Sequence, residues 1–329
     1  MKKLINNPSD IVNEMIDGLI ASSPTLLERV ADSQIVIRKN LGIDKVAIIS
    51  GGGSGHEPAH AGFVGQGMLT AAVCGQVFTS PTPDQIFNAI KTADSGQGVF
   101  LVIKNYSGDI MNFEMAKDMA EMEGIKVDSC IVDDDIAVEN STYTQGKRGV
   151  AGTILVHKIL GAASEQGANL TEIKQLSEKI IPNIKTIGVA FSGATVPEVG
   201  KPGFVLADDE IEYGVGIHGE PGYRREKLQS SKFLAQELIS KLKAAFSFQE
   251  NDQYAVLING LGATPLMEQY VFTNDVLRQL KTEKLNVVFT KVGNYMTAID
   301  MAGVSLTLMK IVDDEWLKNL NYPVTTLAW

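Results

Sequence analysis

An amphipathic helix is predicted at the start of the chain from the spacing of its apolar positions. The apolar pairs Ile11/Val12, Met15/Ile16 and Leu19/Ile20 recur every four residues. This spacing places side chains on one face of an α-helix. The preceding segment Asn7-Pro8-Ser9-Asp10 supplies residue types that cap helix N-termini. We therefore expect a helix that begins near residue 10 and buries one face.

Short apolar runs followed by glycine and by helical periodicity come next along the chain. The runs at Lys45–Ser50, Val99–Ile103 and Ile125–Val132 have the length of buried strands. Strands that alternate with helices predict parallel βαβ units. One of the intervening helices, Ile110–Glu123, carries Met111, Phe113, Met115, Met119 and Met122. A methionine-lined binding stripe has this pattern, but a packed core face is the commoner cause, so we expect this face to be buried.

The second half of the chain begins after a long helical region. That region runs from Gly149 to about Leu176 with a break at Gly167-Ala168-Asn169, and Pro182-Asn183 then precedes an apolar run. Further strands are predicted at Ile184–Phe191, Tyr254–Asn259, Asn286–Val292 and Val304–Ile311, with a helix that ends near Glu283 and a charged, half-solvated helix over Glu226–Lys243. We expect an α/β protein of two α/β domains, residues 1–183 and 184–329, with parallel βαβ units in the first and a mixed sheet in the second.

Composition and charge narrow the class of protein. The 329 residues are 44% hydrophobic and 21% charged, enough to bury a core in two domains. The net charge of −10 repels nucleic acid, and no basic run is long enough to offset it. Cys74 and Cys130 have no metal-site or disulfide spacing, and neither a signal peptide nor a membrane-spanning run is recognisable. We expect a cytoplasmic protein without nucleic acid or membrane as partner.

The glycine-rich segment from Ser50 to Pro58 follows a predicted strand, where α/β proteins place ligand sites. Its glycines allow backbone N–H groups to approach an oxyanion or a hydroxyl closely. The segment does not match a dinucleotide fingerprint, and the chain contains no P-loop motif. A histidine within the segment, His56, strengthens the prediction of a ligand site.

Three further histidines, His60, His157 and His218, were considered as metal ligands or nucleophiles. The letters of His56-Glu57-Pro58-Ala59-His60 match the zinc motif HExxH. Pro58 would disrupt the helix that such a site requires, so we expect no metal there and assign His60 to packing. His157 falls in an apolar helical run and is predicted to be structural, whereas His218 is flanked by glycine as His56 is.

Two acidic positions follow predicted strands. Asp109 precedes a predicted helix and fits either an N-cap or, if it points into a site, a general base. The run Asp133-Asp134-Asp135 has carboxylates suited to magnesium, but consecutive side chains point in different directions, so a solvated loop is favoured.

Five segments together resemble the substrate-binding K subunit of phosphotransferase-dependent dihydroxyacetone kinases. They are Gly51–Pro58, Phe78–Asp84, Ile103–Asp109, Val132–Asp135 and Gly214–Gly222. The resemblance extends through nearly the whole chain. It implies that His218 binds dihydroxyacetone covalently as a hemiaminal, and that Asp109 and His56 contact the substrate hydroxyls and assist proton removal. By the same resemblance Gly53, Ser80 and Lys104 complete the polar pocket.

The resemblance also implies partners. ATP-dependent relatives carry a fused nucleotide-binding domain, whereas K subunits meet a separate L subunit that holds ADP and magnesium and is rephosphorylated from phosphoenolpyruvate through phosphotransferase proteins. We therefore expect no cofactor in this chain, and a homodimer. K-like paralogues that sense dihydroxyacetone and act as coactivators of a transcription factor are the alternative. Ser192–Pro197 and Thr297–Met301 depart from the common kinase-subunit sequence, and we expect both to lie away from the pocket.

Overall fold

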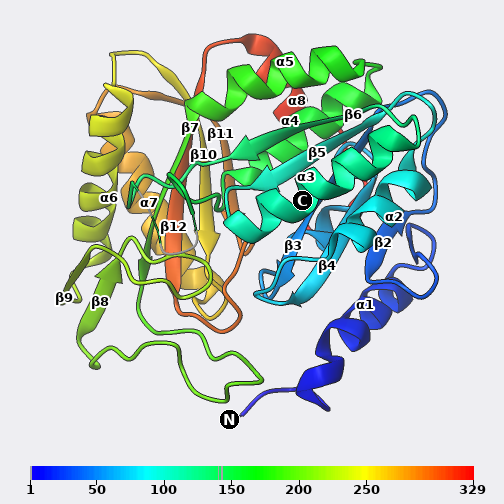
Figure 1. Cartoon of the computed structure of the whole chain (residues 1–329). Coiled ribbons are helices and arrows are strands. Elements are labelled where there is room, and N and C mark those ends of the chain that lie inside the picture. The colour runs from blue at the N-terminus through cyan, green and yellow to red at the C-terminus, as the bar shows by residue number, and fades with distance from the viewer. Residues whose placement is uncertain (1, 140, 142–143) are drawn as a thin grey trace.

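The computed structural model describes residues 2–139, 141 and 144–329, and two six-stranded sheets form its framework (Figure 1). The first sheet has the order β1-β2-β4-β3-β5-β6. Strand β3 pairs in parallel with β4 and β5, and β5 pairs in parallel with β6. The edge strands β1 and β2 are antiparallel. The strand bounds are β1 Leu27–Arg29, β2 Ile35–Arg38, β3 Ala47–Ser54, β4 Ala71–Val77, β5 Val99–Lys104 and β6 Val127–Val132.

The second sheet is mixed and has the order β11-β10-β12-β7-β8-β9. Only β10 and β11 pair in parallel, and the other neighbours are antiparallel. Its strands are β7 Ile184–Ala190, β8 Glu210–Tyr213, β9 Arg224–Lys227, β10 Gln253–Gly260, β11 Asn286–Gly293 and β12 Gly303–Ile311. The α/β class, with parallel βαβ units in the first part and a mixed sheet in the second, is thereby confirmed.

Helices cover the faces of both sheets. Helices α2 and α3 pack on one face of the first sheet, and α6 and α7 pack on one face of the second (Figure 1). The bounds are α1 Ile11–Ser22, α2 Pro83–Ala93, α3 Ser107–Met122, α4 Thr153–Glu165, α5 Leu170–Ile180, α6 Ser231–Phe246, α7 Leu266–Thr282 and α8 Asp314–Asn321, with short 3₁₀ turns η1 Pro8–Asp10, η2 Ala61–Phe63 and η3 Ile181–Asn183. Among the described residues, no helix is both long and apolar enough to cross a bilayer.

Helix α4 belongs to a core that the two sheets share. Residues Thr153–Ser164 are all buried, as expected for a helix that is apolar on most of its surface. The same core cluster contains Ile48 of β3, Leu257 of β10 and Trp316 of α8. The division at residue 183 falls between the two sheets, but their cores are continuous, so the two-domain boundary stays a prediction.

Two expectations from the sequence are wrong. The methionine face of α3 is exposed, with Met111 57%, Met115 51% and Met122 88% accessible. Of the predicted face only Phe113 is buried, and it packs with Ala116 and Ala120 against the sheet, because these small alanines let the helix lie close to it. The charged stretch from Glu226 is not one helix: β9 ends at Lys227 and α6 begins only after Ser230, whose hydroxyl accepts a capping bond from the Phe233 amide.

Candidate functional site

A pocket of about 490 Å³ lies where the carboxyl ends of the parallel strands meet a loop from the second part of the chain. Four predicted site residues line it: Gly53, Ser80, Asp109 and His218. The carboxyl edge of a parallel sheet is the usual ligand position in α/β folds, because the connecting loops converge there. The remaining lining residues are Phe78, Tyr106, Ser107 and Gly108. The other two predicted residues, His56 and Lys104, lie buried just beneath the lining.

His56 and His218 meet at the base of this pocket. Their Nε2 atoms are 3.1 Å apart. The His56 Nδ1 atom lies 2.8 Å from the carbonyl oxygen of Thr297. A carbonyl oxygen only accepts hydrogen bonds, so Nδ1 must carry the proton of a neutral His56 ring, and Nε2 then presents a lone pair.

Glu220 fixes the other imidazole in the same way. Its Oε1 lies 3.1 Å from His218 Nδ1, and its Oε2 accepts a bond of 2.9 Å from the His218 amide. Burial alone would raise the pKa of Glu220, but the hydrogen bond from His218 and the charges of His218 and Arg148 hold it at about 2. The carboxylate therefore accepts a hydrogen bond from Nδ1, and in the neutral His218 ring Nε2 presents a lone pair.

Two lone pairs thus face each other across 3.1 Å. Burial, and after it the charges of His218 and Lys104, lower the pKa of His56 well below its usual value, which keeps this ring neutral at pH 7. When both rings are neutral, no hydrogen joins the two Nε2 atoms. The arrangement is suited to a bound molecule that offers an electrophilic carbon to one nitrogen and a hydroxyl to the other.

Lys104 and Asp109 form a buried ion pair below the glycine segment. Lys104 Nζ is 3.2 Å from Asp109 Oδ2 and 3.4 Å from the Gly51 carbonyl oxygen. A Cβ at Gly52 would lie 2.4 Å from Nζ, so only glycine leaves room for the lysine head. Asp109 lies within the first turn of α3, whose N-cap is Tyr106, so the N-cap interpretation of Asp109 is wrong. Asp109 still lies at the positive, N-terminal end of the α3 dipole, which favours a carboxylate, and its side chain lines the pocket.

Aromatic rings wall the histidine pair. Phe78 stacks on His56 with ring centroids 5.1 Å apart, and Tyr106 meets His218 edge-on at 4.5 Å. Sequence reasoning did not assign either ring a role, although both occur within the segments quoted for the resemblance. Glu220 was likewise missed, although its place two residues after the glycine-flanked His218 was a usable signal.

The aspartate run connects the two sheets. Asp134 accepts bonds of 2.8 Å from the amides of both Val150 and Gly152, and one of 2.5 Å from the Thr186 hydroxyl on β7. Asp135 pairs with buried Arg148 at 2.6 Å. Both carboxylates are buried and satisfied by protein donors, so the solvated-loop expectation is wrong for them. No group of His, Cys, Asp or Glu side chains in the described part of the chain is arranged to hold a metal ion.

Arg148 links this junction to the His218 loop. Its Nη2 donates 2.6 Å to the Gly214 carbonyl oxygen, four residues before His218. Gly216 leaves space for Glu220, whose Oε2 would lie 2.0 Å from a Cβ at that position. The loop that carries His218 is therefore held by a cation from the first part of the chain.

His60 and His157 form a second histidine pair, away from the pocket lining. His60 Nδ1 and His157 Nε2 are 2.9 Å apart, and both rings are buried. Burial lowers the pKa of His157 to about 3, and the charge of Lys104 adds to this effect. The segment from His56 to His60 is not helical, as the presence of Pro58 suggested.

One family departure contacts the loop that carries His56. Besides the bond from His56 to the Thr297 carbonyl, the Ile299 amide donates 2.8 Å to the Gly55 carbonyl oxygen. The segment Thr297–Met301 thus contacts the loop that carries His56, and none of its residues lines the pocket, as expected. Ser192 and its neighbours are not among the pocket's lining residues.

Comparison with known proteins gives a consistent result. A family model described as the Dak1 domain matches residues 17–328. The chain is 66% identical over 328 residues to the "PTS-dependent dihydroxyacetone kinase, dihydroxyacetone-binding subunit DhaK" of Lactococcus lactis subsp. lactis (strain IL1403), covering 100% of this chain and 99% of that protein. It is 47% identical to the "DhaKLM operon coactivator DhaQ" of the same organism, covering 99% and 100%. Among solved structures, a dihydroxyacetone kinase operon co-activator matches with a TM-score of 0.92 at 47% identity, covering 96% of this chain and 97% of that one.

Proposed function

The chain belongs to the Dak1 domain family, and from this membership we propose that it is the dihydroxyacetone-binding subunit of a phosphotransferase-dependent dihydroxyacetone kinase. The observation that carries the proposal is the pair of opposed Nε2 atoms of His56 and His218, 3.1 Å apart at the base of the pocket. A small ketone with a hydroxyl on each side of the carbonyl offers an electrophilic carbon to one Nε2 atom and a hydrogen-bond donor to the other.

The substrate is held as a covalent hemiaminal on His218. Its Nε2 lone pair forms a bond to the carbonyl carbon while the π pair of the C=O bond moves onto oxygen, which takes up a proton. The imidazole gives up its Nδ1 proton, so the adduct is neutral overall. Glycerol has hydroxyls but no carbonyl, so it is discriminated against by the absence of this bond.

Two groups then act on the substrate hydroxyls. His56 Nε2 accepts a hydrogen bond from one hydroxyl, and Asp109 accepts the proton of the hydroxyl that is phosphorylated. Lys104 lies beneath the lining and acts through its 3.2 Å contact with Asp109. Gly53 and Ser80 supply backbone and hydroxyl contacts from the lining.

The phosphoryl group comes from a separate subunit. In this proposal an L subunit carrying ADP and magnesium docks over the pocket and is recharged from phosphoenolpyruvate through phosphotransferase proteins. The chain acts as a homodimer in the cytoplasm and binds no nucleotide or metal itself. The absence of a P-loop motif from the sequence supports this division of labour.

The second candidate is a dihydroxyacetone sensor that acts as coactivator of a transcription factor. It is supported by the full-length similarity to a coactivator and by the contact of the departing segment Thr297–Met301 with the His56 loop. The kinase subunit is preferred because the identity to DhaK, 66%, exceeds the 47% identity to DhaQ.

Reconstitution tests the choice. The chain is mixed with dihydroxyacetone, phosphoenolpyruvate, the general phosphotransferase proteins, the multiphosphoryl donor and the ADP-loaded L subunit. A kinase subunit yields dihydroxyacetone phosphate, and omission of the chain abolishes it. Ligand binding without turnover in the complete mixture, together with dihydroxyacetone-dependent association with a transcription factor, replaces the first proposal by the second.

A further inference from the structure

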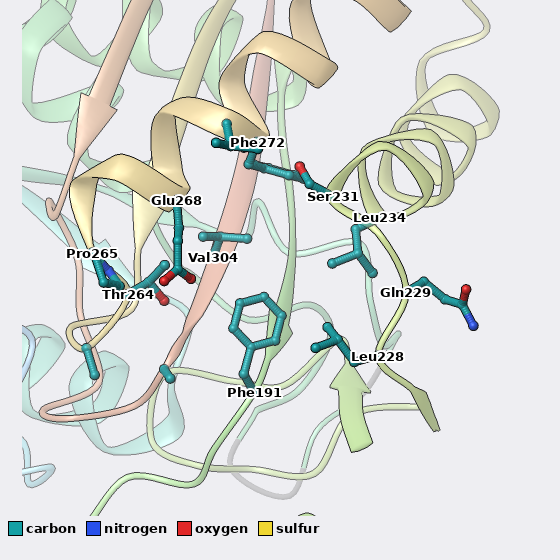
Figure 2. A pocket seen from close by; sticks show the side chains of 13 residues that line it. Phe191, Leu228, Gln229, Ser231, Leu234, Thr264, Pro265, Glu268, Phe272 and Val304 are labelled. Carbon is teal, nitrogen blue, oxygen red and sulfur yellow. The ribbon is translucent and has the colours of Figure 1, made fainter. Parts of the chain in front are cut away.

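A second pocket, also of about 490 Å³, lies on the second sheet between the N-terminal ends of α6 and α7 (Figure 2). None of its lining residues belongs to the ketone pocket. Its walls are mostly apolar, with Phe191 and Val304 on one side and Leu234 and Phe272 on the others. The site described above makes no use of it.

Exposed apolar side chains extend from this pocket onto the surface of the same two helices. They are each at least 44% accessible: Leu228, Phe233, Leu266, Met267, Tyr270 and Val271. We call this set, with the pocket, the α6–α7 groove. Large apolar side chains that cluster around a hollow are characteristic of a protein-binding surface, because a soluble monomer rarely leaves such area in water.

The α7 wall of the groove is acidic, whereas the α6 side carries Lys227, which pairs with Asp209 at 2.8 Å, and the exposed Lys232. The Glu268 carboxylate points into the hollow (Figure 2), and no ion pair involving it is found in the described part of the chain. From Gly260 to Leu277 the only charged residues are Glu268 and Asp275, and both are acidic. A carboxylate set in apolar walls favours a cation that arrives on an apolar body and disfavours an acidic one.

We propose that the α6–α7 groove is a docking site for a protein partner that presents an amphipathic helix with Lys or Arg beside its apolar residues. The apolar side chains of that helix enter the pocket between Phe191 and Phe272, and its cation pairs with Glu268. This mode of recognition places an apolar helix face in a groove and fixes its register through a flanking charge. The site is independent of the ketone chemistry.

The groove has a wall in common with the segment that supports His56. The Thr264 hydroxyl donates 2.7 Å to the Gly303 carbonyl oxygen, and the Ala263 amide donates 3.0 Å to Met301. Both Ala263 and Thr264 line the groove. The same stretch of chain, a few residues earlier, supplies the Thr297 carbonyl oxygen that accepts the hydrogen bond from His56 Nδ1. A docked partner therefore contacts the backbone that positions the ketone site.

The test uses two synthetic helical peptides with the full chain. One is an amphipathic helix of Leu, Ala and Lys, and the other has Glu in place of every Lys. Fluorescence anisotropy should show binding of the Lys peptide and little or none of the Glu peptide. Val271→Asp should weaken binding of the Lys peptide by about tenfold or more, because a buried anchor contact is lost and a charge is placed against it. Glu268→Gln should weaken it several-fold.

Matched controls separate the groove from the general acidity of the protein. Met122→Asp and Glu121→Gln, on the exposed face of α3, make the same chemical changes away from the groove and should leave the affinity unchanged. Met267→Asp, at a position 75% exposed, repeats the Val271→Asp test should that variant fold poorly. Dihydroxyacetone binding should persist in every variant, which keeps this test separate from that of the proposed function.

Three results would overturn the proposal. The first is equal binding of the two peptides. The second is an equal loss of affinity in the α3 controls, which would mean that the peptide binds to acidic surface in general. The third is a fall in particle mass by light scattering when Val271 is replaced by Asp, which would show that a second copy of this chain already occupies the groove.

Discussion

His56 and His218, 162 residues apart in the chain, face each other through Nε2 atoms that lie 3.1 Å apart. Each ring uses its Nδ1 elsewhere, on the Thr297 carbonyl and on the Glu220 carboxylate respectively. In each neutral ring the hydrogen therefore lies on Nδ1, because the partner of Nδ1 can only accept a hydrogen bond. The first part of the chain supplies His56 and the second supplies His218, and Phe78 and Tyr106 pack against these two rings.

We predict that covalent binding of dihydroxyacetone depends on His218. Incubation with dihydroxyacetone should add the mass of one ketone per chain, detected by mass spectrometry of the intact protein under non-denaturing conditions. His218→Ala should show no such adduct, because it removes the nitrogen that is proposed to bond to the carbonyl carbon. Persistence of the same adduct in His218→Ala, or its absence from the wild type while ligand demonstrably binds, would mean that the assignment is wrong.

Glu220 is expected to act through His218 as a positioning residue. In Glu220→Gln the amide still fits the space, but its nitrogen faces the His218 amide as a second donor and the negative charge beside the ring is lost. Adduct formation should fall by about 10²-fold or more, as for other carboxylates that orient a catalytic histidine. The occupancy of the adduct against dihydroxyacetone concentration measures this, with Glu121→Gln on α3 as control. If the dependence of adduct occupancy on dihydroxyacetone concentration is unchanged in Glu220→Gln, Glu220 only stabilises the loop.

Asp109→Asn is nearly isosteric and separates binding from chemistry. We expect dihydroxyacetone to bind with measurable affinity, while phosphoryl transfer in the reconstituted mixture falls by about 10²–10⁴-fold if Asp109 is the general base. Calorimetry for binding and coupled detection of dihydroxyacetone phosphate give the two numbers. Full turnover in this variant would assign Asp109 only to pairing with Lys104.

The buried pair of His60 and His157 should make stability depend on pH. Burial depresses the pKa of His157 in the folded protein to about 3, from a value near 6.5 when it is solvated. Between about pH 3 and pH 6.5 His157 is therefore protonated in the unfolded chain but neutral in the folded chain. The free energy of unfolding consequently falls as the pH is lowered below about 6.5. His157→Gln should remove up to about 1.4 kcal/mol per pH unit from that slope.

Urea unfolding at several pH values between 4 and 7 measures the slope. Ser164→Ala, which removes a buried bond from the same helix to the Val46 carbonyl, titrates no group and should lower stability without changing the slope. Parallel curves for wild type and His157→Gln would mean that His157 is not kept neutral by the fold.

Local sequence patterns determined much of this protein. The runs before Gly51 and Gly108 predicted strands β3 and β5, because a strand that is buried on both faces reads as a continuous apolar run. A glycine next to His56 and a glycine next to His218 marked both rings as candidates before any contact was known. These features depend on residues close together in the chain, where spacing alone limits the conformation.

Burial on α3 was decided by the tertiary structure. The helix has apolar residues on two faces, one of methionines and one of Phe113 with small alanines, and periodicity cannot say which one packs. The sheet accepts the face that allows the closer approach, so the methionines remain in water. The same limit applies to Asp134 and Asp135, whose partners Thr186 and Arg148 come from other segments.

The chemistry of the site also required the tertiary structure. The sequence indicated His56 and His218 separately as candidate site residues, and the family resemblance implied that both belong to one site. Only the fold showed that their Nε2 atoms oppose each other, that Thr297 and Glu220 fix their protons, and that Lys104 lies beneath the pocket. The reason is physical: a tautomer is set by hydrogen-bond partners within about 3 Å, and those partners lie up to hundreds of residues away along the chain.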